Sequence, residues 1–223
     1  MSGKGLRQIT GKVITFLTLF LMKSHSIQLE IAGPTAMWTR PDTGSSPVSY
    51  AAPTFSAVKG IFESILRWKS VNIRPTKVEI CRPVQFHRYT TNYGGSLRAS
   101  DAISKGASFQ FYAVVLVNVC YRLYAEAEFA RHHESTTWPP HAFHDAFNRA
   151  LGRGQWFYTP CLGWKEFAPE YVGPFRPETR VCETENHELP TMLRTVFDQP
   201  QAGRVKPTFS RKLRVEKGVL VYA

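Results

Sequence analysis

Motifs of the common nucleotide-dependent and hydrolytic enzymes are missing from this chain of 223 residues. It holds no Walker loop and no GxGxxG, GxSxG or DxD pattern. It also has no internal repeat and no low-complexity tract. These absences exclude the usual phosphate-cradling loops and the serine-hydrolase elbow, so a function must be sought in composition and in the order of elements.

Cysteine is scarce, and its spacing excludes two kinds of site. The four cysteines lie far apart and never form a CxxC pair: Cys81, Cys120, Cys161 and Cys182. This pattern is typical of free thiols in a reducing compartment and not of a zinc cage or a disulfide framework, so we predict a cytoplasmic protein without a metal or other cofactor.

A run long enough to cross a membrane is also missing near the N-terminus. The apolar run Val13–Met22 has ten residues, too few to span a bilayer. Basic residues precede it in the order of a secretory signal, but no small-x-small cleavage site follows promptly. We interpret residues 1–22 as an N-terminal extension, with Met22 as a plausible true start and a signal peptide as the alternative.

Acidic residues are in deficit. Seventeen Asp and Glu stand against 28 Lys and Arg, giving a formal net charge of +11 and a pI near 9.7. This excess favours a polyanionic partner, with nucleic acid first and an anionic membrane second. The 43% hydrophobic and 13% aromatic content argues against general disorder.

Hydrophobic periodicity predicts a strand, a helix and then two strands. Ser26–Ile31 alternates as a half-buried strand, Lys77–Phe86 alternates again, and Phe109–Phe129 alternates as one long strand or two joined by a bulge. A polar loop is expected at His87–Ser108. This order opens a ferredoxin-like (RRM-like) sheet with one open face and a long β-hairpin, so we predict the α+β class.

The clearest helix lies between Ser49 and Lys69. Its apolar residues recur at i, i+3, i+4, i+7 and i+8: Val58, Ile61, Phe62, Ile65 and Leu66. Tyr50 stands just before its start, where a helix N-terminus readily holds a phosphate. Tyr50 is therefore placed either to touch a phosphate or to pack against the helix.

A second helix is expected from His141 to about Leu151. His141 and His144 share one side of its first turn, yet no cysteine or HExxH pattern accompanies them, so solvated histidines are the simpler reading than a metal site. Metal-free RNA cleavage needs a base, an acid and a cation, and His, Tyr, Lys and Arg can supply them. Beyond this helix we expect short strands and turns around Trp156–Tyr158, Cys161–Phe167 and Gly218–Tyr222.

Several segments, taken in order, resemble the CRISPR-associated Cas-five family, and specifically its subtype I-C branch. They are Trp38–Pro41, Ser49–Tyr50, Ser56–Ala57, Gly60–Ile61, Trp68–Lys69, Arg82–Val84, Asn118–Val119 with Tyr121, and Cys161–Gly163 with Glu166–Phe167. The resemblance runs from about Ile27 to the C-terminus.

The resemblance implies an RRM-like RNA-binding domain at residues 23–155 and a smaller C-terminal β region at 156–223. It implies a subunit of a type I Cascade complex in antiviral defence that holds the crRNA 5′ handle, contacts the backbone and large subunits, and meets target DNA only through the complex. In this branch the protein also cuts precursor crRNA without metal. We expect RNA contacts from these residues: Arg40, Lys59, Lys69, Arg88, Asn92, Arg98, Arg149, Arg153 and Lys165.

The expected catalytic set departs from the family in part. Tyr50 matches the family's tyrosine, but the slots of its Lys-His pair fall on Ala142 and Phe143. His141 and His144 flank those slots, so the predicted set is Tyr50, His141 and His144, giving a metal-independent endoribonuclease. A non-catalytic structural subunit and a generic RRM-type RNA-binding protein are the alternatives.

Overall fold

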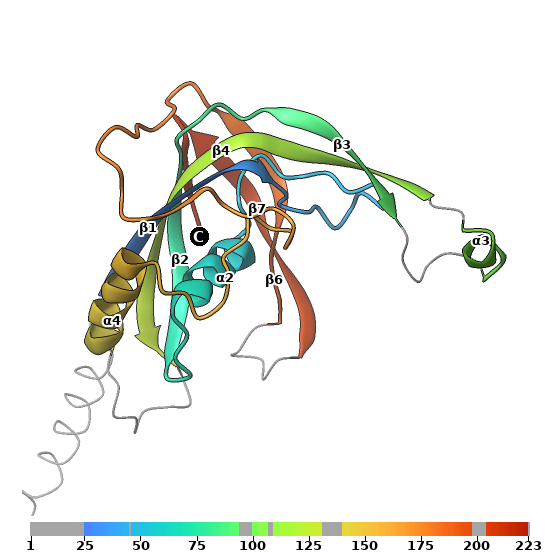
Figure 1. Cartoon of the computed structure of the whole chain (residues 1–223). Helices are drawn as coiled ribbons and strands as arrows, with labels where there is room; N and C mark the ends of the chain where they lie inside the picture. The colour runs from blue at the N-terminus through green and yellow to red at the C-terminus, as the bar shows by residue number, and fades with distance from the viewer. Residues whose placement is uncertain are drawn as a thin grey trace, which may run out of the picture.

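The computed structural model describes residues 25–44, 46–93, 100–106, 109–130, 140–197 and 204–222, so the predicted extension at 1–22 lies outside the described residues. The helices are α2 (Phe55–Ile65), α3 (Ser100–Ser104) and α4 (Pro140–Arg153). The strands are β1 (His25–Ala36), β2 (Val71–Ile80), β3 (Phe86–Tyr93), β4 (Phe109–Phe129), β5 (Tyr171–Gly173), β6 (His187–Phe197), β7 (Val205–Glu216) and β8 (Val219–Val221) (Figure 1). In these residues no helix is long and apolar enough to cross a membrane.

The 21-residue strand β4 is the centre of the sheet, and of the two alternatives for Phe109–Phe129 the structure has one long strand. Its C-terminal half pairs with β1 on one side and β2 on the other, and its N-terminal half pairs with β3. Asn118 adopts a left-handed φ of 55° where the two halves meet. Beyond that residue the β3–β4 hairpin leaves the body of the molecule, and we call it the arm (Figure 1).

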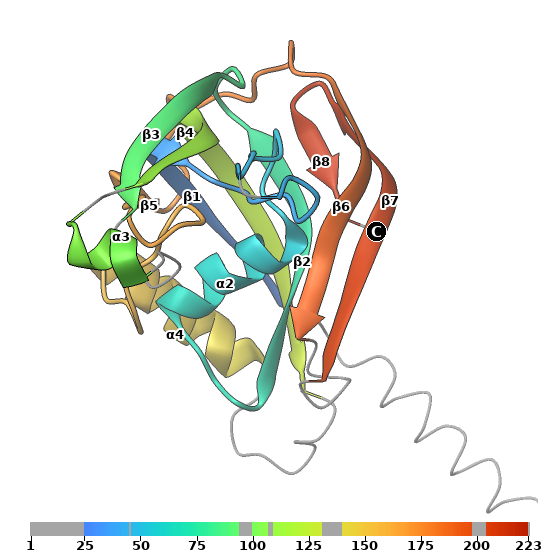
Figure 2. The same cartoon turned by 90° about the vertical axis from the view of Figure 1, so that its right-hand side faces the viewer.

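The sheet is antiparallel, with the strand order β5-β1-β4-β2-β8-β7-β6. Helices α2 and α4 cover the same face of it (Figure 2). Alternate residues of the central strands, such as Leu29 and Leu123, are fully buried against the helices. Phe62 of α2 and Phe147 of α4 meet there with ring centroids 5.7 Å apart. The α+β class is therefore as predicted.

The C-terminal strands form a hairpin that turns back onto α2 (Figure 2). Strands β6 and β7 have 11 and 12 residues, longer than the short strands expected from the sequence. Strand β8 joins them to β2 at Lys77–Glu79. Tyr222 then donates a hydrogen bond of 2.7 Å to the Pro53 carbonyl and packs its ring on Phe55, which ties the C-terminus to the start of α2.

Three predictions of secondary structure are wrong, two of them in the first half of the chain. The predicted loop His87–Ser108 begins with β3, because the N-terminal half of β4 offers it a pairing edge that local sequence does not reveal. The predicted strand Lys77–Phe86 is displaced: β2 runs from Val71 to Ile80, and Pro83, which has no amide hydrogen for a ladder bond, lies in the segment after it.

The segment Cys161–Phe167, expected to contain a short strand, is irregular. Gly163 has a φ of 95°, and a Cβ there would collide with the Met37 carbonyl. The Met37 amide also donates to the Leu162 carbonyl at 2.9 Å. Close approach of two backbones, and not strand pairing, therefore determines the local structure.

Candidate nucleic-acid interface

A groove of about 950 Å³ lies between α2, the start of β2 and the end of β6. The outer face of α2 forms its first wall. Thr54 begins this helix by accepting a hydrogen bond of 3.2 Å from the Ala57 amide. Helical periodicity then buries one stripe and turns the other side outward, where the groove is lined by Ser56, Lys59, Gly60 and Glu63, with Arg67 just beyond the helix.

The first residues of β2 form the floor of the groove. Strand β8 pairs with β2 only at Lys77–Glu79, so within the described chain the outer edge of Val71–Arg74 has no strand beside it. Lys59 reaches this edge from α2 and donates a hydrogen bond of 2.9 Å to the Asn72 side chain. The Lys59 ammonium group is therefore held against the floor of the groove.

The end of β6 forms the second wall, and Tyr50 fixes its position. The Leu193 amide donates to the Tyr50 hydroxyl at 3.2 Å. The next residue, Arg194, lies over the Phe55 ring with its guanidinium carbon 4.3 Å from the centroid. Phe197 lines the groove at the end of the strand and is 68% exposed.

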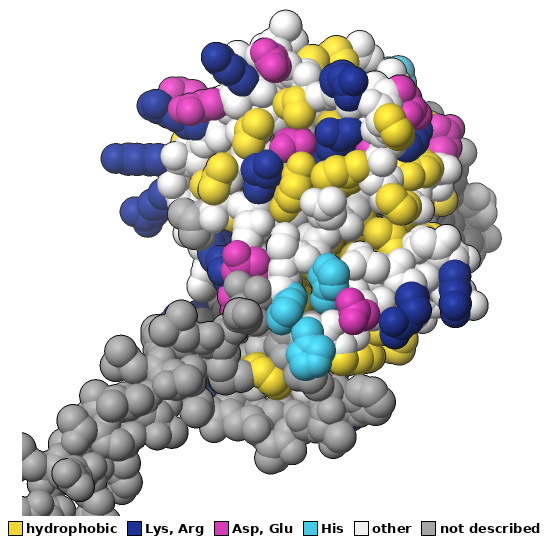
Figure 3. Space-filling view, turned by 90° about the vertical axis from the view of Figure 1, so that its left-hand side faces the viewer, with side chains coloured by type: hydrophobic (Ala, Val, Ile, Leu, Met, Phe, Trp, Pro, Cys, Tyr) yellow, Lys and Arg dark blue, Asp and Glu magenta, His cyan; other side chains and the backbone are white. Residues whose placement is uncertain are grey.

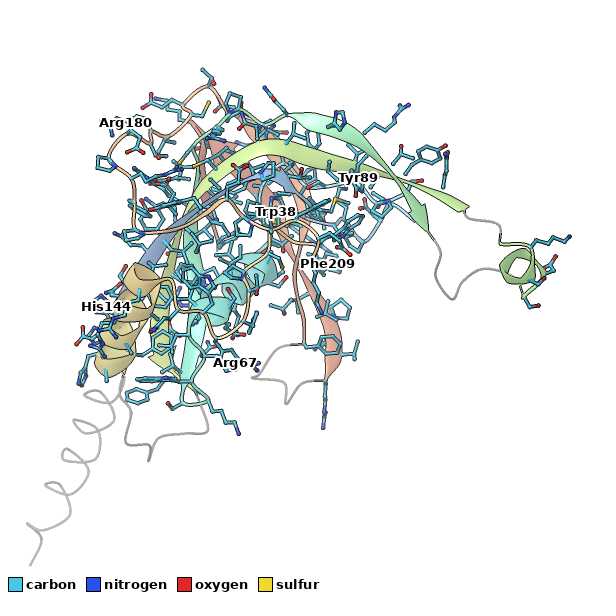
Figure 4. All side chains as sticks on the ribbon, viewed as in Figure 1. Trp38, Arg67, Tyr89, His144, Arg180 and Phe209 are labelled. Atoms are coloured by element: carbon cyan, nitrogen blue, oxygen red, sulfur yellow. The ribbon has the colours of Figure 1, made fainter. Side chains whose placement is uncertain are left out.

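The groove carries more positive than negative charge. Its lining includes five cations, Lys59, Arg67, Lys69, Arg74 and Arg194, and two carboxylates, Glu63 and Glu128. Arg74 is neutralised by Glu126 and by Glu128, the latter at 2.6 Å. Lys59, Arg67 and Lys69 form no ion pair with any described residue. Figure 4 shows Arg67 beside this part of the molecule. Cations together with an exposed aromatic ring suit the phosphates and bases of a single-stranded nucleic acid.

On the face of the sheet opposite the helices, the cations of the β2–β4 ladder are already paired. Arg74 binds the carboxylates of Glu126 and Glu128 across this ladder. Lys77 binds Glu79 at 2.7 Å. Tyr124 donates to the same Glu79 at 3.0 Å. In this part of the face that binds RNA in an ordinary RRM, Arg74 and Lys77 are thus engaged by carboxylates.

Tyr50 is poorly placed to exchange a proton with a ligand. Its side chain is only 6% exposed. Burial raises the pKa of Tyr50, and the hydrogen bond from the Leu193 amide offsets this only in part. The hydroxyl therefore stays protonated at neutral pH, and it already accepts a hydrogen bond from the Leu193 amide.

The structure brings His141 and His144 together with a third imidazole, His25 at the start of β1. The His25 ring lies 6.1 Å from that of His141 and 6.2 Å from that of His144. His144 also contacts Asp145 at 3.1 Å. Figure 3 shows the histidines gathered on one face of the molecule. In the described chain, no group of three or more His, Cys, Asp or Glu side chains could hold a metal ion.

Tyr50 and the histidines do not meet. The Tyr50 amide donates to the Trp38 carbonyl at 2.8 Å, so Tyr50 lies beside Trp38. Trp38 and His144 lie on separate parts of the molecule in Figure 4. The predicted catalytic set is thus divided: Tyr50 lies against β6, whereas His141 and His144 lie at the start of α4.

Of the predicted RNA contacts, the structure brings Lys59 and Lys69 to the groove. Arg40 instead forms an ion pair of 2.7 Å with Asp42. The others lie elsewhere: Arg88 is exposed on the arm, Arg149 and Arg153 are exposed on α4, and Lys165 is exposed in the loop before β5. Asn92 lies in β3, where its backbone pairs with Gln110 of β4, while its side chain and all of Arg98 lie outside the described residues.

Sequence reasoning missed Arg67, Arg194, Phe197 and His25. Arg67 continues the polar face of α2 four residues after Glu63, so helical periodicity could have indicated that it lies beside Lys59 and Glu63. The other three reach their sites through strand pairing between distant segments, which a single sequence does not reveal.

The sequence of this chain is similar to proteins of one known family. Residues 26–218 match the family described as CRISPR-associated protein (Cas_Cas5). Among curated proteins, the chain is 29% identical to "CRISPR pre-crRNA endoribonuclease Cas5d" of Thermus thermophilus, over 85% of this chain and 81% of that protein. It is also 29% identical to the protein of the same name from Mannheimia succiniciproducens, over 78% of this chain and 85% of that protein.

The fold has solved counterparts. One, titled "Crystal Structure of CRISPR-associated Protein", superposes with a TM-score of 0.66 at 22% identity and covers 90% of this chain and 92% of its own. At this identity the likeness concerns the fold alone.

Proposed function

The chain belongs to the CRISPR-associated protein (Cas_Cas5) family, and from this premise we propose that it is the crRNA-binding subunit of a type I-C Cascade complex in antiviral defence. The observation that carries this proposal is the groove, where Lys59, Arg67 and Lys69 lack carboxylate partners in the described chain beside the exposed ring of Phe197. We propose that this groove holds the 5′ handle of the crRNA. The phosphates of the handle would bind the cations, and its bases would stack on the aromatic ring.

We also propose that the central part of the fold is ferredoxin-like. The series β1-α2-β2-β4-α4-β5 has the strand order β5-β1-β4-β2, with each neighbouring pair antiparallel and both helices on one face. This is the split βαβ arrangement with an added arm. On this reading residues 23–155 hold most of the RRM-like domain, and 156–223 supply its last strand and the C-terminal β region.

We further propose that the protein cleaves precursor crRNA through its histidines. In internal RNA cleavage a base removes the 2′-OH proton, the 2′-oxygen attacks phosphorus to form a cyclic phosphate, and an acid protonates the departing 5′-oxygen. Neighbouring imidazoles can serve as that base and acid. His25, His141 and His144 are such a group, whereas Tyr50 acts in our proposal as a positioning residue for β6.

Two curated relatives are named pre-crRNA endoribonucleases, which supports this activity. The competing function is a structural subunit that binds mature crRNA and leaves cleavage to another component. In both cases its partners would be the Cascade backbone and large subunits in the cytoplasm. Failure to copurify with them on co-expression would contradict membership of the complex.

The groove is tested by RNA binding to the triple variant Lys59→Gln, Arg67→Gln, Lys69→Gln. We expect the affinity for labelled repeat RNA to fall on the order of 10- to 100-fold, and the dependence of log K on log salt to become shallower by about 2. Lys217→Gln, at an exposed turn outside the groove, is the matched control and should bind as wild type. An unchanged slope in the triple variant would overturn the groove assignment.

Cleavage is tested with labelled repeat RNA in EDTA. We expect wild type to cut at one position and the variant His25→Gln, His141→Gln, His144→Gln to lose about 100-fold or more of the rate. His87→Gln, on the exposed face of the arm, is the control. Undiminished cutting by the triple variant would refute the histidine site, and intact RNA with tight binding by wild type would favour the structural subunit.

A further inference from the structure

A second cavity, of about 290 Å³, lies on the face of the sheet opposite the helices, under the segment that follows β5. It is lined by Cys81, Arg82, Cys120, Arg176, Glu178, Thr179 and Arg180. None of these residues lines the groove described above. Figure 4 shows Arg180 at the far end of the molecule from Arg67. The cavity is therefore a separate feature.

A buried carboxylate organises the wall of this cavity. Glu30 is fully buried and accepts hydrogen bonds from the Arg176 amide at 3.0 Å, the Arg176 guanidinium at 2.6 Å and the Thr179 hydroxyl at 2.9 Å. Arg122 lies 3.5 Å from the same carboxylate and donates to the carbonyls of Arg176 and Thr179. Two guanidinium groups thus share one carboxylate, which leaves a net positive charge and a fixed loop.

Two further guanidinium groups line the cavity without a carboxylate partner among the described residues. Arg82 donates to the neutral side chain of Asn118, and Arg180 donates to the carbonyls of Pro177 and Thr179. The one exposed carboxylate in the lining, Glu178, forms no ion pair with a described residue. A guanidinium carries five N–H donors in a planar fork, so both arginines keep donors for another acceptor.

Two thiols also line the cavity. Cys81 and Cys120 lie opposite each other, with the Cys81 amide donating to the Cys120 carbonyl at 2.8 Å. The Arg176 guanidinium donates a hydrogen bond of 3.7 Å to the Cys120 sulfur. The guanidinium groups of this cavity therefore reach acceptors other than Glu30.

The cavity also lies at the base of the arm. Asn118, the partner of Arg82, is the left-handed residue inside β4 at which the arm departs. Strained backbone of this kind persists where surrounding contacts hold it in place. An anion bound by Arg82 would therefore be adjacent to the bend of the arm.

We propose that this cavity is a phosphate-binding site in which Arg82, Arg176 and Arg180 donate charge-assisted hydrogen bonds to one phosphate group. Two sources share this chemistry: a backbone phosphate of a nucleic acid that runs over this face, and free phosphate. The site goes beyond the proposed handle-binding groove and does not depend on it.

The site is tested with inorganic phosphate as the probe. Calorimetric titration of the full-length chain in chloride buffer should show binding, and the variant Arg82→Gln, Arg180→Gln should weaken it by about tenfold or more, as expected for loss of charge-assisted hydrogen bonds. Arg180→Gln alone, at an exposed position, should give a smaller loss with an unchanged Tm. Arg211→Gln, exposed on β7, should bind phosphate as wild type.

Salt titration of RNA binding by the same variants separates the two sources. A salt dependence shallower by about 1 to 2 in the double variant assigns the site to a nucleic-acid phosphate, whereas an unchanged slope with weakened phosphate binding assigns it to free phosphate. Two results would overturn the proposal. One is that wild type does not bind phosphate. The other is that the folded Arg180→Gln variant and the folded double variant bind phosphate as tightly as wild type. Neither result bears on the groove, whose own variants decide the proposed function.

Discussion

At the scale of single residues, Tyr50 shows how a functional expectation and a structural role differ. The sequence places it before a helix, where a phosphate could bind. The structure buries it and uses its hydroxyl as the acceptor for the Leu193 amide. The amide of the half-buried Leu193 has this hydroxyl as its partner, so Tyr50 contributes to the position of β6 and hence to one wall of the groove.

Replacing Tyr50 by Phe should therefore act on stability. We expect the free energy of unfolding to fall by about 1 to 3 kcal/mol, because the Leu193 amide loses its acceptor, and we expect RNA cleavage per folded molecule to persist. Urea denaturation measures the first and the EDTA assay the second. Abolished cleavage with unchanged stability would show instead that the hydroxyl takes part in the reaction.

Glu30 gives a prediction that depends on pH. Burial alone would raise its pKa, but hydrogen bonds from Arg176 and Thr179 outweigh burial and lower it. A lowered folded-state pKa means that the carboxylate contributes stability above its unfolded pKa of about 4 and loses it as the pH falls through the folded value.

The variant Glu30→Gln should accordingly be destabilised by about 3 to 5 kcal/mol at pH 7, since it leaves the half-buried Arg122 and Arg176 without their counter-ion. The difference from wild type should shrink as the pH falls from about 4, where the unfolded chain takes up a proton at Glu30, through the lowered pKa of this carboxylate in the folded protein. Urea denaturation at a series of pH values measures both. Thr184→Val, at an exposed position, is a control, and a difference independent of pH would contradict the ion-pair account.

At the scale of elements, the β6–β7 hairpin decides the shape of the groove. Phe197 and Phe209 are both exposed rings on this hairpin, at 68% and 46%, but only Phe197 lines the groove. The pair therefore separates a contribution to RNA binding from a general effect of removing an aromatic side chain.

Phe197→Ala should weaken binding of repeat RNA by about 5- to 100-fold, the range expected for loss of one stacked base, while the free energy of unfolding changes by less than about 0.5 kcal/mol. Phe209→Ala should leave RNA affinity unchanged. Fluorescence anisotropy with both variants measures the difference. Equal losses in the two would indicate that the groove is not where bases stack.

The elements predicted correctly are those with a strong local pattern. The stripe of α2, the histidine-led helix α4 and the strict alternation of β4 all follow from burial of one face. Strand β3 and the length of β6 and β7 were missed, because few of their described residues are buried and their apolar alternation is weak. The groove was only half predicted for another reason: Lys59 and Lys69 lie near one helix, whereas Arg194 and Phe197 arrive from a strand more than 100 residues later.

At the scale of the whole molecule, the two faces of the sheet divide the charge. On the face opposite the helices, Arg74 and Lys77 are paired with Glu79, Glu126 and Glu128, whereas the arginine-lined cavity is not neutralised in this way. In the groove, Lys59, Arg67 and Lys69 form no ion pair with a described residue. The central claim is therefore that RNA follows the groove between α2, β2 and β6, and not the open face used by an ordinary RRM.

Ultraviolet cross-linking of repeat RNA to the full-length chain, followed by peptide mass spectrometry, tests this claim most directly. We predict cross-links at the groove aromatics Trp68 and Phe197, both suppressed in the variant Lys59→Gln, Arg67→Gln, Lys69→Gln. Cross-links at Tyr124 on the opposite face, with none at Trp68 or Phe197, would contradict the account.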